Sequence, residues 1–239
     1  MIDTTVLKTL SQIALLFPAF IIIFTFKGFF KSLVAKWVGD ETAEEEGFLT
    51  LNPLAHIDLS GIIILITALV AVTLLFSGLL PRGFLLLLII LFGIRLVIPT
   101  PIDERNFRSY RWGGILTSLA DFQASILLAI ATIMIMKCCI ALRLPANVVV
   151  TSLEICNTVV DLSVMLGILN LIPLPPFDGG RLMKYLFPTK YDYIFEWLEE
   201  YAFFIILFIF FAPGLSDVFW GMLSGAAASV KQFLFSLFF

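Results

Sequence analysis

NLIPLPPFDGGR, residues Asn170–Arg181, interrupts an otherwise apolar chain. A long apolar run reaches this stretch and stops there. It contains three prolines, one carboxylate and two glycines, namely Pro173, Pro175, Pro176, Asp178, Gly179 and Gly180. Near the other end of the chain, a first apolar segment finishes with TFKGFFKSLVAKWVGD, residues Thr25–Asp40. The relation between these two stretches decides what the chain can do.

The composition indicates a membrane protein. Of 239 residues, 60% are hydrophobic and 14% are charged, and the mean hydropathy is +1.05. Soluble domains carry about 25% charged residues. Apolar runs such as LLLLIILF (Leu85–Phe92) are continuous rather than alternating, which favours spanning helices over barrel strands. The sequence therefore predicts an all-α integral membrane protein. A net charge of −3 with no basic patch predicts no nucleic-acid partner.

The apolar segments predict about six transmembrane helices within a single membrane domain, residues 1–239. The expected spans are Leu7–Val38, Leu59–Leu80, Gly113–Leu142, Asn147–Leu171, Ile194–Ala212 and Asp217–Phe238. Gly83–Ile98 is apolar but short, so an extended or re-entrant segment buried by its neighbours is expected there. Residues 7–181 would form the core, followed by two C-terminal helices at 194–239. Between these parts, Arg181–Tyr193 is expected to be a polar loop.

Basic residues predict the orientation. One set of loops carries Lys36, Arg105, Arg108, Arg111, Arg181, Lys184 and Lys190. Because short cytoplasmic loops are rich in Lys and Arg, this side is expected to be cytoplasmic, provided that Gly83–Ile98 crosses the membrane. The acidic loop Gly39–Asp58 and the Asp178 loop would then lie near the cytoplasmic face, with the N-terminus outside.

Three motifs resemble those of the site-2 protease family of intramembrane zinc metalloproteases. Asn170–Arg181 resembles the family's N-x-x-P-x-P-P-x-D-G motif, whose Asp is a zinc ligand. LTLNPLAHID (Leu49–Asp58) resembles the turn after the first catalytic helix, and PIDERNFR (Pro101–Arg108) resembles the loop before the next core helix. The resemblance implies a site-2-protease-like bundle in a bacterial inner (cytoplasmic) membrane. The expected motif and groove residues are Asn52, Pro53, His56, Asn170, Pro173, Pro175, Pro176, Gly179 and Gly180.

The resemblance also implies an H-E-x-x-H motif on the first helix, and this chain lacks it. Counting back from Gly39–Asp40 places that motif at KGFFK, residues Lys27–Lys31. In the family, two histidines at i and i+4 reach one zinc ion, and the Glu deprotonates the zinc-bound water. Lysine has no lone pair to offer, Gly28 has no side chain, and His56 is the single histidine. We therefore expect no catalytic residue and no zinc, with Asp178 as the one retained ligand position.

Two lysines at i and i+4 supply the positive charge that a zinc ion would bring beside Asp178. We expect a buried salt bridge from Asp178 to Lys27, to Lys31 or to both, because an unpaired charge at membrane depth costs about 2.5–3.5 kcal/mol. The alternative is that both lysines reach the nearby interface. Asp121 is a second candidate partner. It lies in ADFQAS (Ala120–Ser125), where the family has A-G-P-x-x-N.

These residues predict a catalytically inactive pseudoprotease that serves as a binding or structural subunit of a membrane protein complex. Its partners would be the lipid bilayer and other membrane proteins. Two alternatives stay open. One is an active intramembrane metalloprotease whose unusual site combines His56 with carboxylates. The other is a transport or ion-conducting subunit that uses Asp121, Glu154 and Asp161. Interhelical hydrogen bonding or a water-lined notch is the simpler interpretation of the last two residues. Lys231 is expected to reach the interface.

Overall fold

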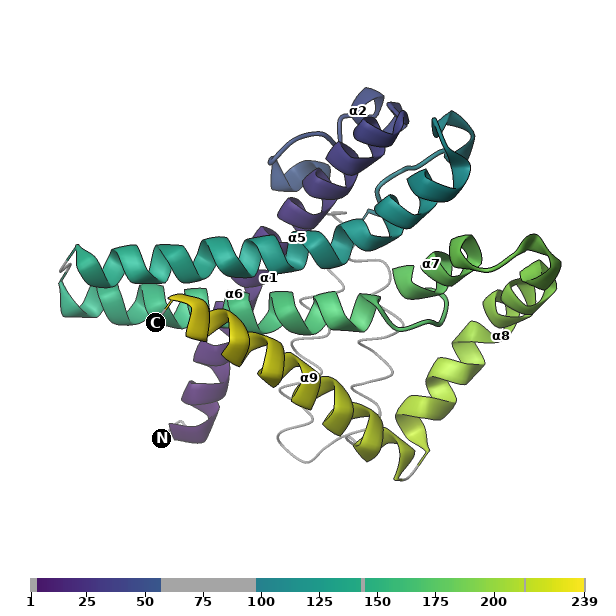
Figure 1. Ribbon diagram of the computed structural model, residues 1–239. Helices are drawn as coiled ribbons and strands as arrows, with labels where there is room; N and C mark the ends of the chain where they lie inside the picture. The colour runs from purple at the N-terminus through teal and green to yellow at the C-terminus, as the bar shows by residue number, and fades with distance from the viewer. Residues whose placement is uncertain (1–3, 57–97, 143–144, 213, 239) are drawn as a thin grey trace.

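The structure, a computed structural model, describes residues 4–56, 98–142, 145–212 and 214–238 (Figure 1). These residues form helices and turns, with no strand among them. The predicted span Leu59–Leu80 and nearly all of Gly83–Ile98 lie outside the described residues. The helices are α1 (Thr4–Val38), α2 (Thr42–Glu45), η1 (Pro53–Ala55), η2 (Glu104–Asn106), α5 (Tyr110–Ala141), α6 (Ala146–Asn170), α7 (Asp178–Leu186), η3 (Thr189–Tyr191), α8 (Asp192–Phe211) and α9 (Leu215–Phe238).

Three of the described helices are long and apolar enough to cross a membrane. These spans are Leu16–Val38 of α1, all of α5, and Val149–Asn170 of α6. The prediction that α8 and α9 are helices is confirmed, and both begin slightly before the predicted bounds. Whether they cross the membrane stays a prediction, as does the count of six spans.

The α5–α6 hairpin forms the centre of the described bundle, and α1 and α9 cross it (Figure 1). One apolar cluster joins α5, α6 and α9 through Ala129, Ile133, Val160, Val164 and Leu234. A second joins α1, α5 and α6 through Ala19, Ile23, Leu128 and Val159. Small residues are typical of such interfaces within a membrane, because they let helix backbones approach closely.

The prediction of a polar loop at Arg181–Tyr193 is wrong, because most of that stretch is helical. Helix α7 begins at Asp178, whose negative charge is favourable at a helix N-terminus. Its residue Tyr185 is buried against α5. Arg111 of α5 caps the other end, donating from Nε to the carbonyl oxygen of Tyr185 (3.1 Å) and from Nη2 to that of Leu186 (3.2 Å). These contacts come from a distant segment, so the local sequence did not indicate them.

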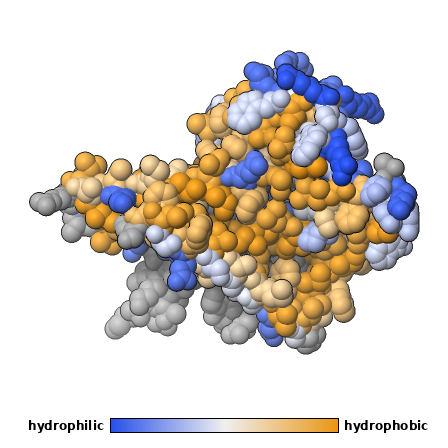
Figure 2. All heavy atoms as spheres, in the orientation of Figure 1, coloured by the Kyte–Doolittle hydropathy of each residue, from blue (hydrophilic) through white to orange (hydrophobic). Residues whose placement is uncertain are grey.

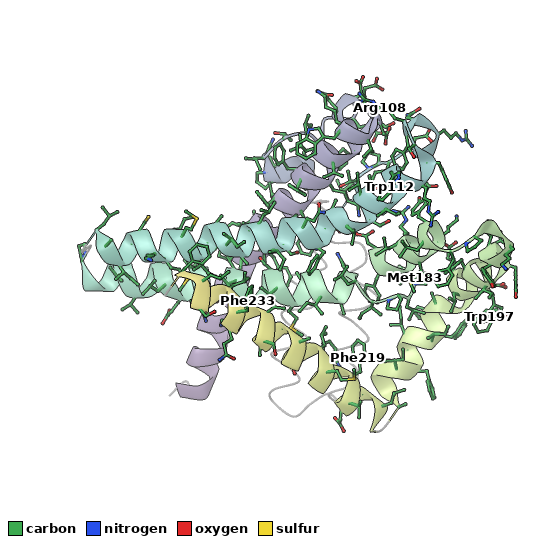
Figure 3. The ribbon with its side chains drawn as sticks, viewed as in Figure 1. Arg108, Trp112, Met183, Trp197, Phe219 and Phe233 are labelled. Atoms are coloured by element: carbon green, nitrogen blue, oxygen red, sulfur yellow. The ribbon has the colours of Figure 1, made fainter. Side chains whose placement is uncertain are left out.

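The surface divides into a small hydrophilic end and a large apolar body. In Figure 2 many of the hydrophilic residues gather at the end where α2 and the connector before α5 lie, and a second group lies where α7 and α8 meet. Large apolar side chains are exposed along α8 and α9, among them Trp197, Phe203, Phe204, Phe208, Met222 and Phe233 (Figure 3). An exposed apolar body of this kind fits a protein that lies in lipid.

Candidate functional site

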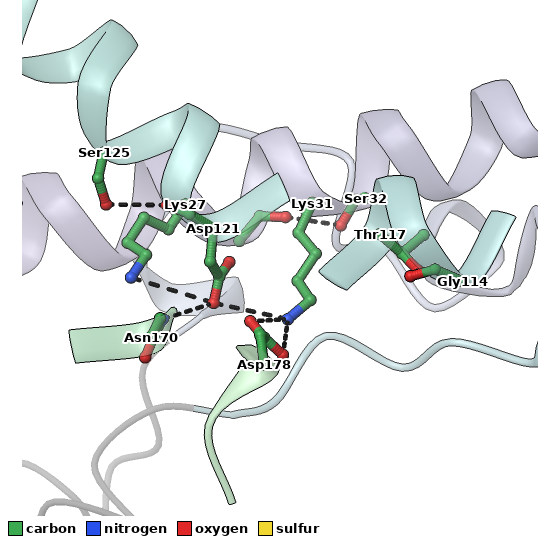
Figure 4. A network of polar contacts seen from close by, with 10 residues as sticks. Lys27, Lys31, Ser32, Gly114, Thr117, Asp121, Ser125, Asn170 and Asp178 are labelled. Carbon is green, nitrogen blue, oxygen red and sulfur yellow. Dashed lines mark hydrogen bonds and ion pairs between the residues drawn. The ribbon is translucent and has the colours of Figure 1, made fainter. Parts of the chain in front are cut away.

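Two lysines, two aspartates and one asparagine meet where α1, α5, α6 and α7 converge (Figure 4). We call these five residues the charge cluster. They are Lys27 and Lys31 on α1, Asp121 on α5, Asn170 at the end of α6, and Asp178 at the start of α7. The two lysines are one helical turn apart, so they share a face of α1.

Lys31 is the centre of the cluster. Its Nζ lies 3.0 Å from Oδ1 and 2.8 Å from Oδ2 of Asp178, and it also lies 3.5 Å from Oδ2 of Asp121. The side chains of Lys31 and Asp178 are only 12% and 10% exposed. One ammonium group thus bridges two carboxylates from different helices.

Lys27 makes a looser ion pair, and it does so with Asp121 rather than with Asp178. Its Nζ lies 4.0 Å from Oδ2 of Asp121. The same carboxylate oxygen accepts a hydrogen bond of 3.1 Å from Nδ2 of Asn170. Lys27 is 5% exposed, so neither lysine reaches toward an interface. Two positive and two negative charges therefore balance inside the protein.

The glycine pair after Asp178 explains how that carboxylate reaches α1. Helix α7 starts directly against the backbone of the preceding proline-rich turn. A Cβ atom at Gly179 would collide with the carbonyl oxygens of Leu171 and Ile172, and one at Gly180 would lie 2.6 Å from the backbone nitrogen of Pro175. Only residues without a side chain allow this approach. The peptide bond between Pro175 and Pro176 in this turn is cis.

His56 lies against Gly28, the position where the H-E-x-x-H motif has its Glu. The histidine is fully buried, and its Nε2 lies 2.8 Å from the carbonyl oxygen of Thr50. Among the described residues its Nδ1 has no hydrogen-bond partner. A Cβ atom at position 28 would collide with Nδ1 and lie 2.7 Å from Cε1 of the ring. The turn that carries His56 is ordered by Asn52, whose Oδ1 accepts from the backbone N–H of Leu54 (3.1 Å), with Pro53 opening η1.

Asp40 joins the end of α1 to the connector before α5, a role that the sequence analysis missed. Its buried carboxylate accepts hydrogen bonds from the backbone N–H of Asp103 (2.8 Å), Nδ2 of Asn106 (3.0 Å) and both the hydroxyl and the N–H of Thr42. Burial raises the pKa of Asp40, but these hydrogen bonds outweigh burial and hold the pKa below its ordinary value. Gly39, at φ +110°, makes the turn that places it.

A small polar pocket adjoins the charge cluster. Besides Lys31 and Asp178, its lining residues are Ile102, Glu104, Thr117, Ser118, Arg181 and Tyr185. Burial, together with a hydrogen bond to the Glu104 carboxylate, raises the pKa of Tyr185, so this phenol stays protonated. The sequence motifs did not indicate the hydroxyl groups of this pocket. Two adjacent hydroxyl residues in the apolar α5 segment, Thr117 and Ser118, could have indicated the pocket, and both are buried.

The model of peptidase family M50 matches residues 20–213 of the chain. The chain belongs to this family, the site-2 proteases. It is also 29% identical over 232 residues to a Bacillus subtilis protein named "Putative zinc metalloprotease YwhC", a match that covers 96% of this chain and 94% of the relative. No solved structure matches. The family assignment predicted from the three motifs is thus confirmed.

The residues at the cluster do not fit the zinc ion of this peptidase family. A catalytic zinc site needs three protein ligands with free lone pairs. Lys27 and Lys31 offer none when charged, and Asp178 is held by Lys31. His56 faces Thr50 and Gly28. Across the described ranges, no three residues of the His, Cys, Asp or Glu types are grouped so that they could hold a metal ion.

Proposed function

We propose that this family member is catalytically inactive and acts as a binding or structural subunit of a membrane protein complex. The observation that carries the proposal is the bidentate contact between Lys31 and Asp178. The one retained ligand position of the family is occupied by a cation of the chain itself. Removing that cation from a buried carboxylate is costly, so the ammonium group competes directly with any metal.

The second support is the absence of a general base at the expected place. Position 28 is glycine, and the space beside it is filled by the ring of His56. General acid–base chemistry requires a titratable group within hydrogen-bond reach of the reacting water. The lysines do not serve as that base, because both are engaged with Asp121 or Asp178. The proposal is thus that the family scaffold is kept, while the described residues at the expected place supply no group that activates water.

The proposed surroundings follow from the family and from the apolar body. A multi-pass protein of a bacterial inner membrane would present its large apolar faces to lipid and to other membrane proteins. An inactive protease of this kind would retain the shape of a substrate groove and use it for binding. The pocket beside Lys31 and Asp178 is the part of that groove that we assign to binding rather than to cleavage.

Metal analysis of the purified full chain tests the proposal. We would express the protein in zinc-supplemented medium and measure zinc per chain by mass spectrometry, for the natural sequence and for Asp178→Asn. We expect a negligible amount of zinc in both proteins. About one zinc per chain that is lost in Asp178→Asn would contradict the proposal, because that is the stoichiometry of a catalytic site.

An active protease with unusual ligands is the second candidate, and the name of the Bacillus subtilis relative favours it. Its unusual ligands would have to include His56 and at least two carboxylates. The same purified protein separates the two candidates when it is incubated with a fluorogenic transmembrane substrate in liposomes. Cleavage that is abolished by a zinc chelator and by His56→Ala would establish this alternative.

A further inference from the structure

One face of α6 is exposed although it lies in a membrane-spanning helix. Val150, Glu154, Asn157 and Asp161 are all exposed, and their spacing of four, three and four residues places them on one side of the helix. We call these four residues the α6 face. Among the three spanning segments, the share of residues buried inside the protein is lowest in α6, at 28% against 44% in α1 and 39% in α5.

On one half of this face, the negative charge of Asp161 is balanced by a lysine of the same chain. Lys231 of α9 lies 2.5 Å from Oδ1 of Asp161 and 3.0 Å from Oδ1 of Asn157. Asn157 in turn donates from Nδ2 to Oδ2 of Asp161 at 3.3 Å. Lys231 therefore binds the carboxylate of Asp161 on α6, and whether it also reaches the interface stays a prediction.

The other half of the face carries a negative charge, on Glu154, that has no counterpart among the described residues. In the part of the chain that the structure describes, no side chain forms a hydrogen bond or an ion pair with the carboxylate of Glu154. The residue lies five positions into the span Val149–Asn170, about 8 Å from its end. A carboxylate at such a depth is costly in lipid, and intramembrane carboxylates face a partner or water.

We propose that the α6 face docks a transmembrane helix of a partner protein that carries a lysine or arginine at the depth of Glu154. Charge complementarity carries this inference. Two other carboxylates of the described chain, Asp178 and Asp161, are each paired with a lysine. Lys31 on α1 pairs with Asp178, and Lys231 on α9 pairs with Asp161. The inference rests on the proposed binding role and names its surface and the chemistry of its partner.

A second copy of this chain fits the face less well. In a symmetric dimer the same patch meets itself, which would bring Glu154 close to its own counterpart. Like charges placed together in a low dielectric repel each other. The nearby cation of the described chain, Lys231, is already engaged with Asp161 and Asn157. A separate helix with its own cation avoids this conflict.

The test uses the full chain in phosphatidylcholine nanodiscs and a defined probe. The probe is a leucine-rich transmembrane peptide of about 22 residues with a single lysine about 8 Å from one end. A control peptide has leucine in place of that lysine. Energy transfer between labelled chain and labelled peptide reports binding. We expect the lysine peptide to bind about tenfold more tightly than the leucine peptide, and this preference to disappear in Glu154→Gln.

The matched control is Glu199→Gln, which removes an exposed carboxylate of α8 and should keep the preference. Equal binding of both peptides, or an unchanged preference in Glu154→Gln, would overturn the proposal. Energy transfer between two labelled copies of the chain that Glu154→Gln strengthens, because it removes the repulsion between the two carboxylates, would assign the face to a homodimer instead.

Access of water is the remaining competing explanation. With the three native cysteines replaced by alanine, Glu154→Cys would be exposed to a charged, membrane-impermeant thiol reagent. Rapid labelling would assign the face to a water-lined path and overturn the proposal, whereas the absence of labelling in the membrane supports it. The zinc measurement is independent of these results. A zinc-free chain that ignores the lysine peptide would remain an inactive family member with a different docking surface.

Discussion

The Nζ atom of Lys31 lies 2.8 Å from Oδ2 of Asp178, although the two residues are 147 positions apart in the chain. This contact joins the first spanning helix to the start of α7. In the family that the chain belongs to, the aspartate at this motif position binds a metal ion. Here that aspartate forms an ion pair with a lysine of the same polypeptide, and this pairing has consequences for stability.

Replacing Lys31 with leucine should destabilise the protein by about 3–5 kcal/mol, because it leaves Asp178 buried without its partner. Lys31→Leu combined with Asp178→Leu should recover most of this loss, since a buried ion pair can often be exchanged for apolar residues. Unfolding in mixed detergent micelles, followed by the loss of helical circular dichroism, measures the difference. Equal stability of the single and double variants would contradict the assigned contact.

Lys36→Leu is the matched control on the same helix. Lys36 pairs with Glu44 at 2.6 Å, but the two side chains are 41% and 39% exposed. Exposed ion pairs contribute about 0–1 kcal/mol, so this variant should remain close to the natural protein. A loss as large as that of Lys31→Leu would show that removing any lysine from α1 is harmful.

Gly28→Ala should destabilise the protein by about 1–3 kcal/mol, because the new Cβ atom collides with the ring of His56. Adding His56→Ala should relieve most of that cost. The control is Gly221→Ala on α9, where a Cβ atom meets nothing within 4 Å and where alanine favours the helix. Thermal unfolding of the four proteins measures these differences. A neutral Gly28→Ala would mean that the His56 ring moves aside freely.

The hydrogen bonds of Asp40 predict that the folded protein loses stability in acid. They hold its pKa below the ordinary value of 3.8, so the ionised form is favoured in the folded protein. Its contribution is fully present above pH 3.8 and is lost as the pH falls through the folded pKa. Asp40→Asn should cost about 1.5–3 kcal/mol at neutral pH and should flatten the acid side of the stability curve.

Measuring unfolding between about pH 6 and pH 2 checks this, with Glu46→Gln as the control for an exposed acid of the same loop. Parallel curves for Asp40→Asn and the natural protein would contradict the assignment.

Lys231→Leu should loosen α9 from α6, because Asp161 then lies near the middle of a span without its counter-charge. On insertion scales such a charge costs about 2.5–3.5 kcal/mol. The double variant Lys231→Leu with Asp161→Leu should be more stable than Lys231→Leu alone. Limited proteolysis in nanodiscs, scored by the release of α9, provides the measurement. Identical proteolysis of all three proteins would show that the apolar contacts of Leu234 hold α9 by themselves.

The long helices could be predicted from sequence because membrane spans are a local property. Continuous apolar runs predicted α1, α5 and α6 to within a few residues, and two further apolar runs predicted α8 and α9. Helix α7 was missed because its stability depends on Arg111 and on close contact with α5, which are distant in the chain. Its two opening glycines also favour a loop when they are considered alone.

The sequence was enough to predict that Asp178 pairs with a lysine, but not which lysine pairs with which aspartate. An unpaired carboxylate at membrane depth carries a high free-energy cost, so the pairing of Asp178 with a lysine follows from that cost alone. That Lys31 takes both oxygens of Asp178 while Lys27 faces Asp121 depends on how α1 and α5 cross. The contact between His56 and Gly28 likewise arises from the folded turn, and neither residue type indicates it.

The same long-range contact constrains the order in which the protein can be made. Lys27 and Lys31 leave the ribosome and enter the bilayer long before residue 178 exists. Until then, Asp121 on α5 is the carboxylate among the described residues that lies within reach of Lys31. A nascent chain that stops before Asp178 lacks the carboxylate that Lys31 contacts most closely, so the charge cluster can be completed only after the first residues of α7 have been made.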